Sequence, residues 1–373
     1  MNRRWIGAVT VFLIPVLLVV GCAHPRSKQA HPPAKVPFPV EQYYETPPLS
    51  GPVRIVLVKK SPTYLWQKVI LPKTSSSIDG KNQVTLDYFL PVGKGPFPLI
   101  LVSPILGGKY RLERFLGVFL AKRGFAVLIV RRKQLRLLPD EGLDQIEEYL
   151  RTSVIRLRMA LDWAETRSEI DPSRIGSLGI SLGGILNVVL AGVDPRVKVN
   201  AIALAGGDLA DVICYTHVKA IRRYRNQFMK RQGLTVEGLK KRLRETLRTD
   251  PMRFAHRVHP DQTLFFIAWF DLVIGRKHCR KLAKALRDPK TYYFPFGHYS
   301  SILMIPFVRI RALHFFEEKF KTVPPDANTK AGFRRQASSP RHKRSKARDR
   351  RREHSADWRR RQTLSQSDRP PPA

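Results

Sequence analysis

A short strand–turn–helix pattern constrains the fold of this chain more than any other part of the sequence. Residues 174–180 form an apolar, strand-like run, and residues 185–191 form an apolar, helix-like run. The turn between them places Ser181 between Gly179 and Gly183, which is the G-x-S-x-G pattern of a nucleophile elbow. The serine of such an elbow stands clear of the backbone, and the glycines leave room for a strained turn. The pattern predicts that Ser181 is a nucleophile; an ordinary serine in a glycine-rich turn is the alternative.

The sequence around this turn resembles the α/β-hydrolase superfamily, in its branch of dienelactone hydrolases and esterases. The resemblance is carried by Asp171-Pro-Ser-Arg-Ile-Gly and, after it, Gly179-Ile-Ser-Leu-Gly-Gly. It covers about residues 84–320 and neither terminus. It implies an α/β fold with a mostly parallel central sheet flanked by helices. It also implies three catalytic residues that follow one another along the chain as Ser, then Asp or Glu, then His.

Apolar strands alternate with helical patterns along the rest of the central region, which is typical of βαβ units and of a parallel sheet buried on both faces. The expected strands are residues 53–58, 69–70, 83–90, 97–102, 125–130, 174–180, 197–204, 263–270 and 290–296. The expected helices are residues 111–123, 143–166, 182–191, 276–287 and 302–320. We therefore expect one hydrolase-like domain over residues 51–322.

Residues 211–260 depart from this alternation. They read as two helices, 212–231 and 236–248, inserted between two strands. In α/β hydrolases an insertion at this point commonly forms a cap over the nucleophile. The segment is strongly basic, so it either steers anionic substrates or presents a solvated helix face, and we favour the solvated face. Its basic residues are Arg222, Arg223, Arg225, Lys230, Arg231, Lys240, Lys241, Arg242 and Arg244.

The acid that orients the catalytic histidine should follow a strand downstream of Ser181. Asp271 directly follows the strand 263–270, and Asp271-Leu-Val resembles the acid loop of the family. The family's usual glycine before this loop is replaced by Ala-Trp-Phe. Asp208 and Asp211, which follow the preceding strand, stay as alternative acids, and a helix N-cap is the structural alternative for Asp271.

The catalytic histidine is expected on a loop after the last strand. His298 lies directly after the strand 290–296 and before the final helix, which is where the family places this residue. One imidazole must accept the proton of Ser181 and pass it to the leaving group while a carboxylate holds its other nitrogen. The other histidines of this region lie in helical or cap segments: His256, His259, His278 and His314.

Two backbone amides should stabilise the oxyanion. One is that of Leu182, after the nucleophile, and the other comes from the loop that follows the strand 97–102. That loop begins Ser103-Pro104, where the family usually has His-Gly. Pro104 has no amide hydrogen, so we expect Ile105 to donate, with Leu106 as the next candidate.

The sequence predicts neither a metal site nor a cofactor. It contains no H-E-x-x-H and no C-x-x-C, and the glycines of residues 176–184 belong to the elbow. Cys214 and Cys279 lie in different segments, so we expect two free buried thiols; one disulfide is the alternative.

The N-terminus has the pattern of an export signal. Residues 1–21 carry basic residues and then an apolar run, which is typical of a signal peptide. The junction before Cys22 resembles a bacterial lipobox and implies that Cys22 is lipid-modified, with the protein anchored in the cell envelope, more often at the outer membrane. Residues 22–50 are rich in proline, and we expect a stiff, extended tether.

The C-terminal residues 323–373 consist of basic blocks with few apolar residues, and we expect this tail to be disordered. The chain has a formal charge of +37 and a pI of about 10.8. Nucleic acid is one partner of such charge, but the export signal and the lack of interleaved aromatic residues disfavour it. We expect the tail to rest on an anionic surface of lipid headgroups or lipopolysaccharide phosphates.

These features predict a serine hydrolase that cleaves an ester, or with less support an amide or thioester, through an acyl-Ser181 intermediate. The substrate is a small-molecule or lipid-like ester. A catalytically silent hydrolase fold that acts as a binding or structural module of the envelope is the alternative. Acyl transfer is a third function, because it uses the same residues and differs only in whether water is the acceptor.

Overall fold

The structure, a computed structural model, describes residues 36, 38–72, 83–107, 109–132, 135–138 and 140–322. The predicted signal peptide with Cys22, the first part of the tether and the basic tail 323–373 lie outside the described residues. None of the described helices is both long and apolar enough to cross a bilayer.

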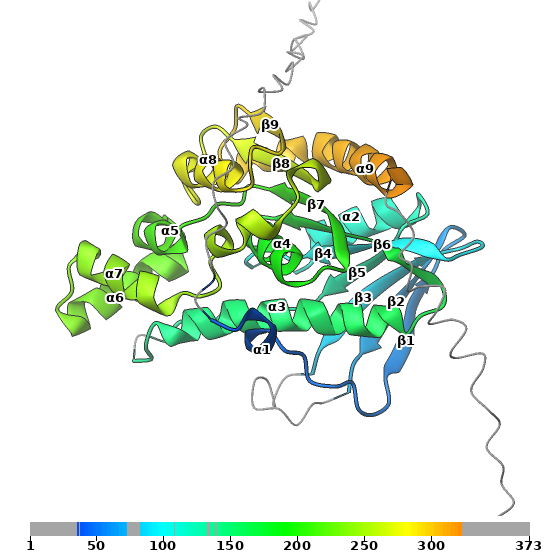
Figure 1. Ribbon diagram of the computed structural model, residues 1–373, viewed down its shortest axis with the longest axis horizontal. Helices are drawn as coiled ribbons and strands as arrows, with labels where there is room; N and C mark the ends of the chain where they lie inside the picture. The colour runs from blue at the N-terminus through cyan, green and yellow to red at the C-terminus, as the bar shows by residue number, and fades with distance from the viewer. Residues whose placement is uncertain are drawn as a thin grey trace, which may run out of the picture. The chain divides into compact units, whose positions relative to one another are not determined.

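A nine-stranded sheet forms the centre of the described chain (Figure 1), with the strand order β1-β2-β3-β5-β4-β6-β7-β8-β9. Strands β1 to β3 are antiparallel to their neighbours, and all pairs from β5 to β9 along the sheet are parallel. This confirms the predicted α/β fold with a mostly parallel sheet. The strands are Arg54–Lys60, Tyr64–Ile70, Thr85–Pro91, Phe97–Ser103, Ala126–Val130, Ile170–Ile180, Val197–Ala203, Thr263–Ala268 and Lys290–Phe294, numbered β1 to β9 in chain order.

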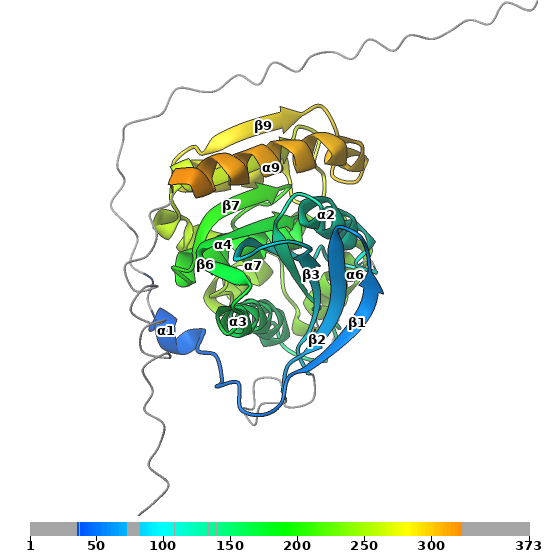
Figure 2. The ribbon, with the colours of Figure 1, turned by 90° about the vertical axis from the view of Figure 1, so that its right-hand side faces the viewer.

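Helices cover both faces of the sheet because its central strands are apolar on both sides; every residue of β5 is buried. Helices α2 (Arg111–Ala121) and α9 (Ile305–Thr322) contribute to one apolar core. Helices α3 (Asp144–Glu165), α4 (Leu182–Val193) and α8 (Arg276–Ala285) contribute to the other. Figure 2 shows α2 and α9 on one side of the strands and α3 on the other.

The inserted segment contains three helices where the sequence predicted two. The expected helix 212–231 is divided into α5 (Leu209–Tyr215) and α6 (Lys219–Gln232). The break lies at Thr216, whose backbone is extended at φ −59° and ψ 145°, and whose hydroxyl accepts a hydrogen bond from the Val218 amide. Helix α7 (Val236–Thr246) follows, and then three short 3₁₀ turns: Pro251–Arg253, Ala255–Arg257 and Pro260–Gln262.

The last part of the predicted tether is folded, which corrects the expectation of an extended segment up to residue 50. Residues Val40–Tyr43 form the short helix α1, and Tyr44 is fully buried. The Tyr43 hydroxyl donates to Glu147 Oε1 at 2.7 Å, and the Tyr44 hydroxyl lies 2.9 Å from the Thr249 hydroxyl. Tyr43 therefore attaches this segment to α3, and Tyr44 attaches it to the chain that follows α7 (Val236–Thr246). Burial of the Tyr44 ring also removes apolar surface from water.

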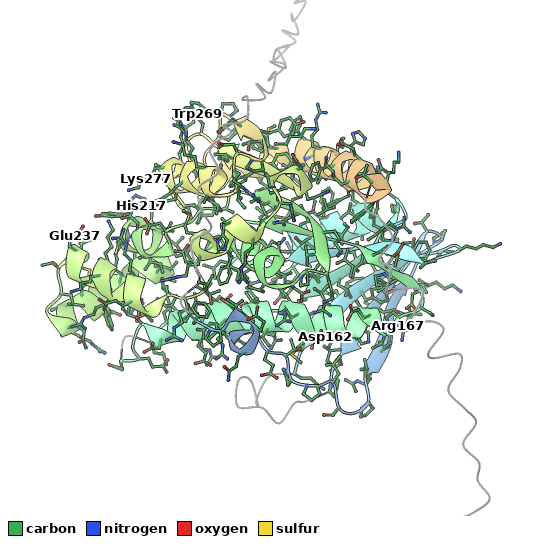
Figure 3. All side chains as sticks on the ribbon, in the orientation of Figure 1. Asp162, Arg167, His217, Glu237, Trp269 and Lys277 are labelled. Carbon is green, nitrogen blue, oxygen red and sulfur yellow. The ribbon has the colours of Figure 1, made fainter. Side chains whose placement is uncertain are left out.

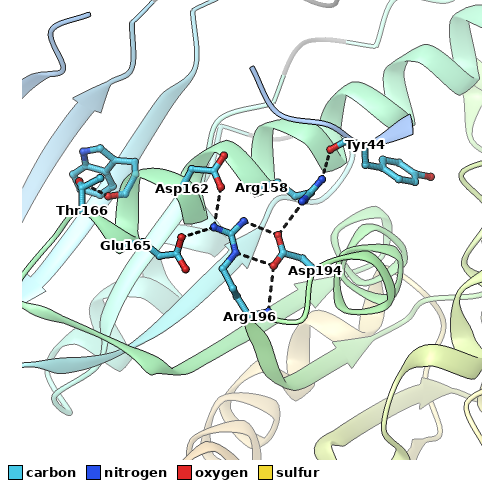
Figure 4. Close-up of polar contacts among 8 residues, drawn as sticks. Tyr44, Arg158, Asp162, Glu165, Thr166, Asp194 and Arg196 are labelled. Carbon is cyan, nitrogen blue, oxygen red and sulfur yellow. Dashed lines mark hydrogen bonds and ion pairs between the residues drawn. The ribbon is translucent and has the colours of Figure 1, made fainter. Parts of the chain in front are cut away.

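A buried cluster of ion pairs joins the end of α4 to α3 (Figure 4). Asp194 is buried, and its Oδ2 lies 2.7 Å from Arg196 Nη2 and 3.1 Å from Arg158 Nε. Arg196 Nη1 also contacts Asp162 at 2.8 Å and Glu165 at 2.9 Å. Burial alone raises the pKa of Asp194, but hydrogen bonds from both arginines outweigh burial and hold that pKa below its ordinary value.

We expect Asp194→Asn to lower the free energy of unfolding by about 3 kcal/mol at pH 7, because Arg158 and Arg196 lose the buried carboxylate that they share. Since the native pKa is lowered, the stabilisation is present above the ordinary aspartate pKa and is lost as the pH falls through the native value. Urea unfolding of both proteins at pH 7 and pH 3 measures this. Glu318→Gln, at an exposed residue, is the control. If the difference in unfolding free energy between the wild type and Asp194→Asn did not become smaller at pH 3, the prediction would be contradicted.

Candidate active site

Ser181 occupies a strained turn between β6 and α4. Its backbone is at φ 56° and ψ −123°, a region that residues with a side chain rarely adopt. The Ser181 amide donates to the Ala203 carbonyl of β7 at 2.8 Å, and the Ser181 carbonyl accepts from the Ile185 amide at 3.0 Å. These bonds attach the turn to both the sheet and the helix, and the side chain is left at the carboxyl edge of the sheet.

The two glycines of the elbow are required by close backbone approaches. A Cβ atom at Gly179 would overlap the Gly183 carbonyl, and a Cβ atom at Gly183 would overlap the Ser103 carbonyl. Both contacts would be with backbone atoms, which have no room to move. The second contact also shows that the loop after β4 packs directly against the first turn of α4.

The structure brings Ser181, His298 and Asp271 together. His298 Nε2 lies 3.0 Å from Ser181 Oγ, and His298 Nδ1 lies 2.8 Å from Asp271 Oδ2. The residues meet because β6, β8 and β9 belong to the parallel run β6-β7-β8-β9, so the loops at their carboxyl ends share one edge of the sheet. The loops after β8 and β9 are also bonded to each other: the Trp269 amide donates to the Phe294 carbonyl at 2.8 Å.

Asp271 orients His298 and also fixes its own loop. The residue is 2% exposed, and its second oxygen accepts from the amides of Val273 at 2.8 Å and Ile274 at 2.9 Å. Burial alone raises the pKa of Asp271, but the His298 hydrogen bond and charge and the two amides together lower it. A buried carboxylate is thus held beside the Nδ1 atom of the histidine ring.

The two alternative acids lie in a different cluster, between the inserted helices and α8. Asp208 Oδ2 contacts Lys281 at 2.6 Å, and Asp211 contacts Lys240, Lys277 Nζ at 2.8 Å and His278 Nε2 at 3.1 Å. Burial opposes ionisation of Asp211, but its lysine partners lower its pKa to about 2. Both nitrogens of His298 already have partners, so neither alternative is needed to orient that ring.

The expected oxyanion donors differ in their surroundings. As the first residue of α4, Leu182 has an N–H group that no carbonyl of the helix accepts. The Ile105 amide instead donates to Glu113 Oε1 at 2.9 Å. Glu113 lies in the first turn of α2 and is 3% exposed. The Ile105 amide, which the sequence predicts as the second oxyanion donor, is thus hydrogen-bonded to a buried carboxylate in this structure.

The remaining candidates take no part in the Ser181 cluster. His278 contacts Asp211, His256 and His259 lie at short 3₁₀ turns, and His314 is exposed on α9. Cys214 and Cys279 are free and buried, as expected, and burial raises the pKa of the Cys214 thiol to about 11. Among the described residues no group of three or more His, Cys, Asp or Glu side chains is arranged to hold a metal ion.

Comparison with known proteins identifies the fold. No protein-family model matches the sequence. The structure resembles that of an acetyl xylan esterase from Paenibacillus sp. R4, with a TM-score of 0.58, 20% identity, and coverage of 73% of this chain and 92% of the esterase. This likeness establishes the α/β-hydrolase fold that the sequence predicted.

Two curated sequences from Rattus norvegicus are also similar. Acyl-coenzyme A thioesterase 2, mitochondrial, is 29% identical over 59% of this chain and 48% of its own length. Acyl-coenzyme A thioesterase 1 is 32% identical over 43% of this chain and 36% of its own length. This chain thus spans about half or less of the length of these relatives.

The geometry predicts a spectroscopic signature. A proton held between His298 Nδ1 and Asp271 should give a resonance far downfield of the backbone amides. We expect Asp271→Asn to remove this resonance from the one-dimensional proton spectrum, because the carboxylate acceptor is lost. The matched variant Asp211→Asn, which changes the acid beside His278, should retain it. Loss of the resonance in Asp211→Asn alone would assign the orienting acid to the other cluster.

Proposed function

We propose that this protein is a serine hydrolase that cleaves carboxylic esters, thioesters included, through an acyl-Ser181 intermediate. The observation that carries the proposal is the bonding of His298, whose two nitrogens lie 3.0 Å from Ser181 Oγ and 2.8 Å from Asp271. A base on one side and a buried carboxylate on the other are what a serine hydroxyl needs to become a nucleophile. The esterase and thioesterase names of the similar proteins support the same bond class.

In the proposed reaction, Ser181 Oγ attacks the carbonyl carbon while its proton passes to His298 Nε2. The Asp271 carboxylate stabilises the resulting imidazolium. The tetrahedral oxyanion lies near the Leu182 amide, at the positive end of the α4 dipole. His298 then gives its proton to the leaving alcohol or thiol. Water attacks the acyl-serine in the same way and releases the acid; an alcohol acceptor in place of water would give acyl transfer.

One observation favours a second function. The Ile105 amide is bonded to the buried Glu113 carboxylate, so one of the two expected oxyanion donors is engaged with the protein itself. A hydrolase fold that has lost turnover would tolerate such a bond. The alternative proposal is therefore a binding or structural module that keeps the hydrolase fold without its activity.

For location, we propose that the protein is anchored to the bacterial cell envelope through a lipid on Cys22, with the outer membrane as its site. The support is the export pattern of residues 1–21 and the small residue before Cys22. The basic tail 323–373 would then lie on anionic headgroups. Incorporation of labelled palmitate into the wild type but not into Cys22→Ala tests the anchor.

We expect a fluorophosphonate probe to label the wild type and not Ser181→Ala, because the probe is attacked only by an activated serine.

We also expect Asp271→Asn to reduce kcat by about 10⁴-fold. An amide neither stabilises the His298 imidazolium nor holds the neutral His298 ring in the tautomer that accepts the Ser181 proton. Rates on p-nitrophenyl esters and acyl-coenzyme A thioesters measure this, and Asp211→Asn is the control that should keep its activity.

Three outcomes separate the alternatives. Equal labelling of the wild type and Ser181→Ala would overturn the nucleophile. A folded wild type with neither labelling nor turnover would favour the silent module. Ester products from an added alcohol, in place of free acid, would identify acyl transfer.

A further inference from the structure

Large apolar side chains are exposed on the two loops that carry Asp271 and His298. We define the apolar rim as six residues: Trp269, Phe270, Leu272, Tyr299, Ile302 and Leu303. Five of them, all except Trp269, are between 62% and 74% exposed, more than any other large apolar side chain of the described residues. Soluble proteins rarely leave a contiguous group of this kind in water, and such groups mark interaction sites.

The rim is contiguous because its two loops are bonded side by side. The amides of Trp269 and Phe270 donate to the carbonyls of Phe294 and Phe296 at 2.8 and 3.0 Å. The ring of Tyr299 lies against that of His298, with 5.5 Å between the centroids. The apolar rim therefore adjoins the candidate site, through Tyr299 beside His298 and through Phe270 and Leu272 on either side of Asp271 in the chain.

Cations accompany the apolar rim. The Arg276 guanidinium lies 3.5 Å from the centre of the Trp269 ring, and Lys277 Nζ lies 5.4 Å from that of the exposed Tyr215. Figure 3 shows Trp269 and Lys277 along the same side of the molecule. The carboxylates nearby are not free to repel an anion, because Asp271 is buried and bonded to His298, and Asp211 is paired with lysines.

This chemistry matches the surface of an anionic bilayer better than any other occupant. Aromatic and aliphatic tips that point into solvent enter the headgroup and acyl boundary, while Arg and Lys meet the phosphates. A pocket for one acyl chain would enclose these side chains rather than expose them. The net charge of +37 complements the same surface. We propose that the apolar rim docks the catalytic edge of the protein onto an anionic phospholipid surface.

It follows, if the proposed hydrolase function holds, that lipid-like esters reach Ser181 directly from the bilayer. The docking itself does not depend on turnover. Binding is therefore measured on the full-length Ser181→Ala protein that also carries Cys22→Ala, because a lipid on Cys22 would itself hold the chain on a vesicle. Turnover is measured separately on the active protein, so that failure of the docking and failure of the hydrolase function are distinguishable.

The first experiment uses vesicles of phosphatidylglycerol and brominated phosphatidylcholine at 0.5 M salt, which screens binding by the basic tail. We expect the bromines to quench tryptophan fluorescence of the Ser181→Ala protein, and expect Trp269→Phe to abolish most of that quenching. Adding Ile302→Ser and Leu303→Ser should lower vesicle affinity about tenfold, because two exposed apolar side chains no longer enter the lipid. Ile55→Ser with Leu57→Ser is the matched control, since these exposed residues lie on β1 at the far edge of the sheet.

The second experiment compares substrates with the active protein. The Ile302→Ser, Leu303→Ser variant should hydrolyse soluble p-nitrophenyl acetate at the wild-type rate and a vesicle-embedded ester about tenfold more slowly. Equal vesicle affinity of rim and β1 variants, or unquenched Trp269, would overturn the docking. Two further results would overturn the docking. If the rim variant changed only the KM for soluble long-chain esters, the rim would belong to an acyl pocket. If the wild type were a dimer that the rim variant dissociates, the rim would bind a protein partner.

Discussion

The strained backbone of Ser181 is the constraint on which the rest of the site depends. A residue with a side chain at φ 56° costs about 1–3 kcal/mol, and the surrounding structure must supply that free energy. The Ala203 carbonyl of β7, the first turn of α4 and the loop after β4 hold it in place. Because Gly183 packs against the Ser103 backbone, the loop that is expected to supply an oxyanion donor is positioned by the same turn that carries Ser181.

The sequence predicts much of this arrangement because each member of the cluster follows a strand. Ser181, Asp271 and His298 stand just after β6, β8 and β9, and a parallel sheet brings the carboxyl ends of its strands to one edge. Local chemistry is therefore enough to find the three residues. Their order along the chain, with the fold, then determines that they meet.

Other features depend on contacts between side chains that are distant in sequence, and no local sequence pattern predicts these contacts. Glu113 reads as an ordinary helix residue, yet its carboxylate occupies the Ile105 amide. Tyr44 reads as part of a proline-rich tether, yet burial against the folded domain fixes it. Both depend on which elements become neighbours, and packing of this kind is a property of the whole fold.

The exposure of the apolar rim is a further feature that the sequence alone does not predict. In the sequence, Ile302 and Leu303 open the helix that is expected over residues 302–320. The segment instead begins with a 3₁₀ turn, Ser300–Met304, and α9 starts at Ile305 with Pro306 in its first turn. Within this 3₁₀ turn both side chains are exposed, Ile302 at 63% and Leu303 at 68%. Folding gains nothing from exposing them, which is why we propose that a lipid surface covers them. Tyr299 of the same apolar rim lies against His298, so the proposed contact would form at the edge of the sheet that carries Ser181.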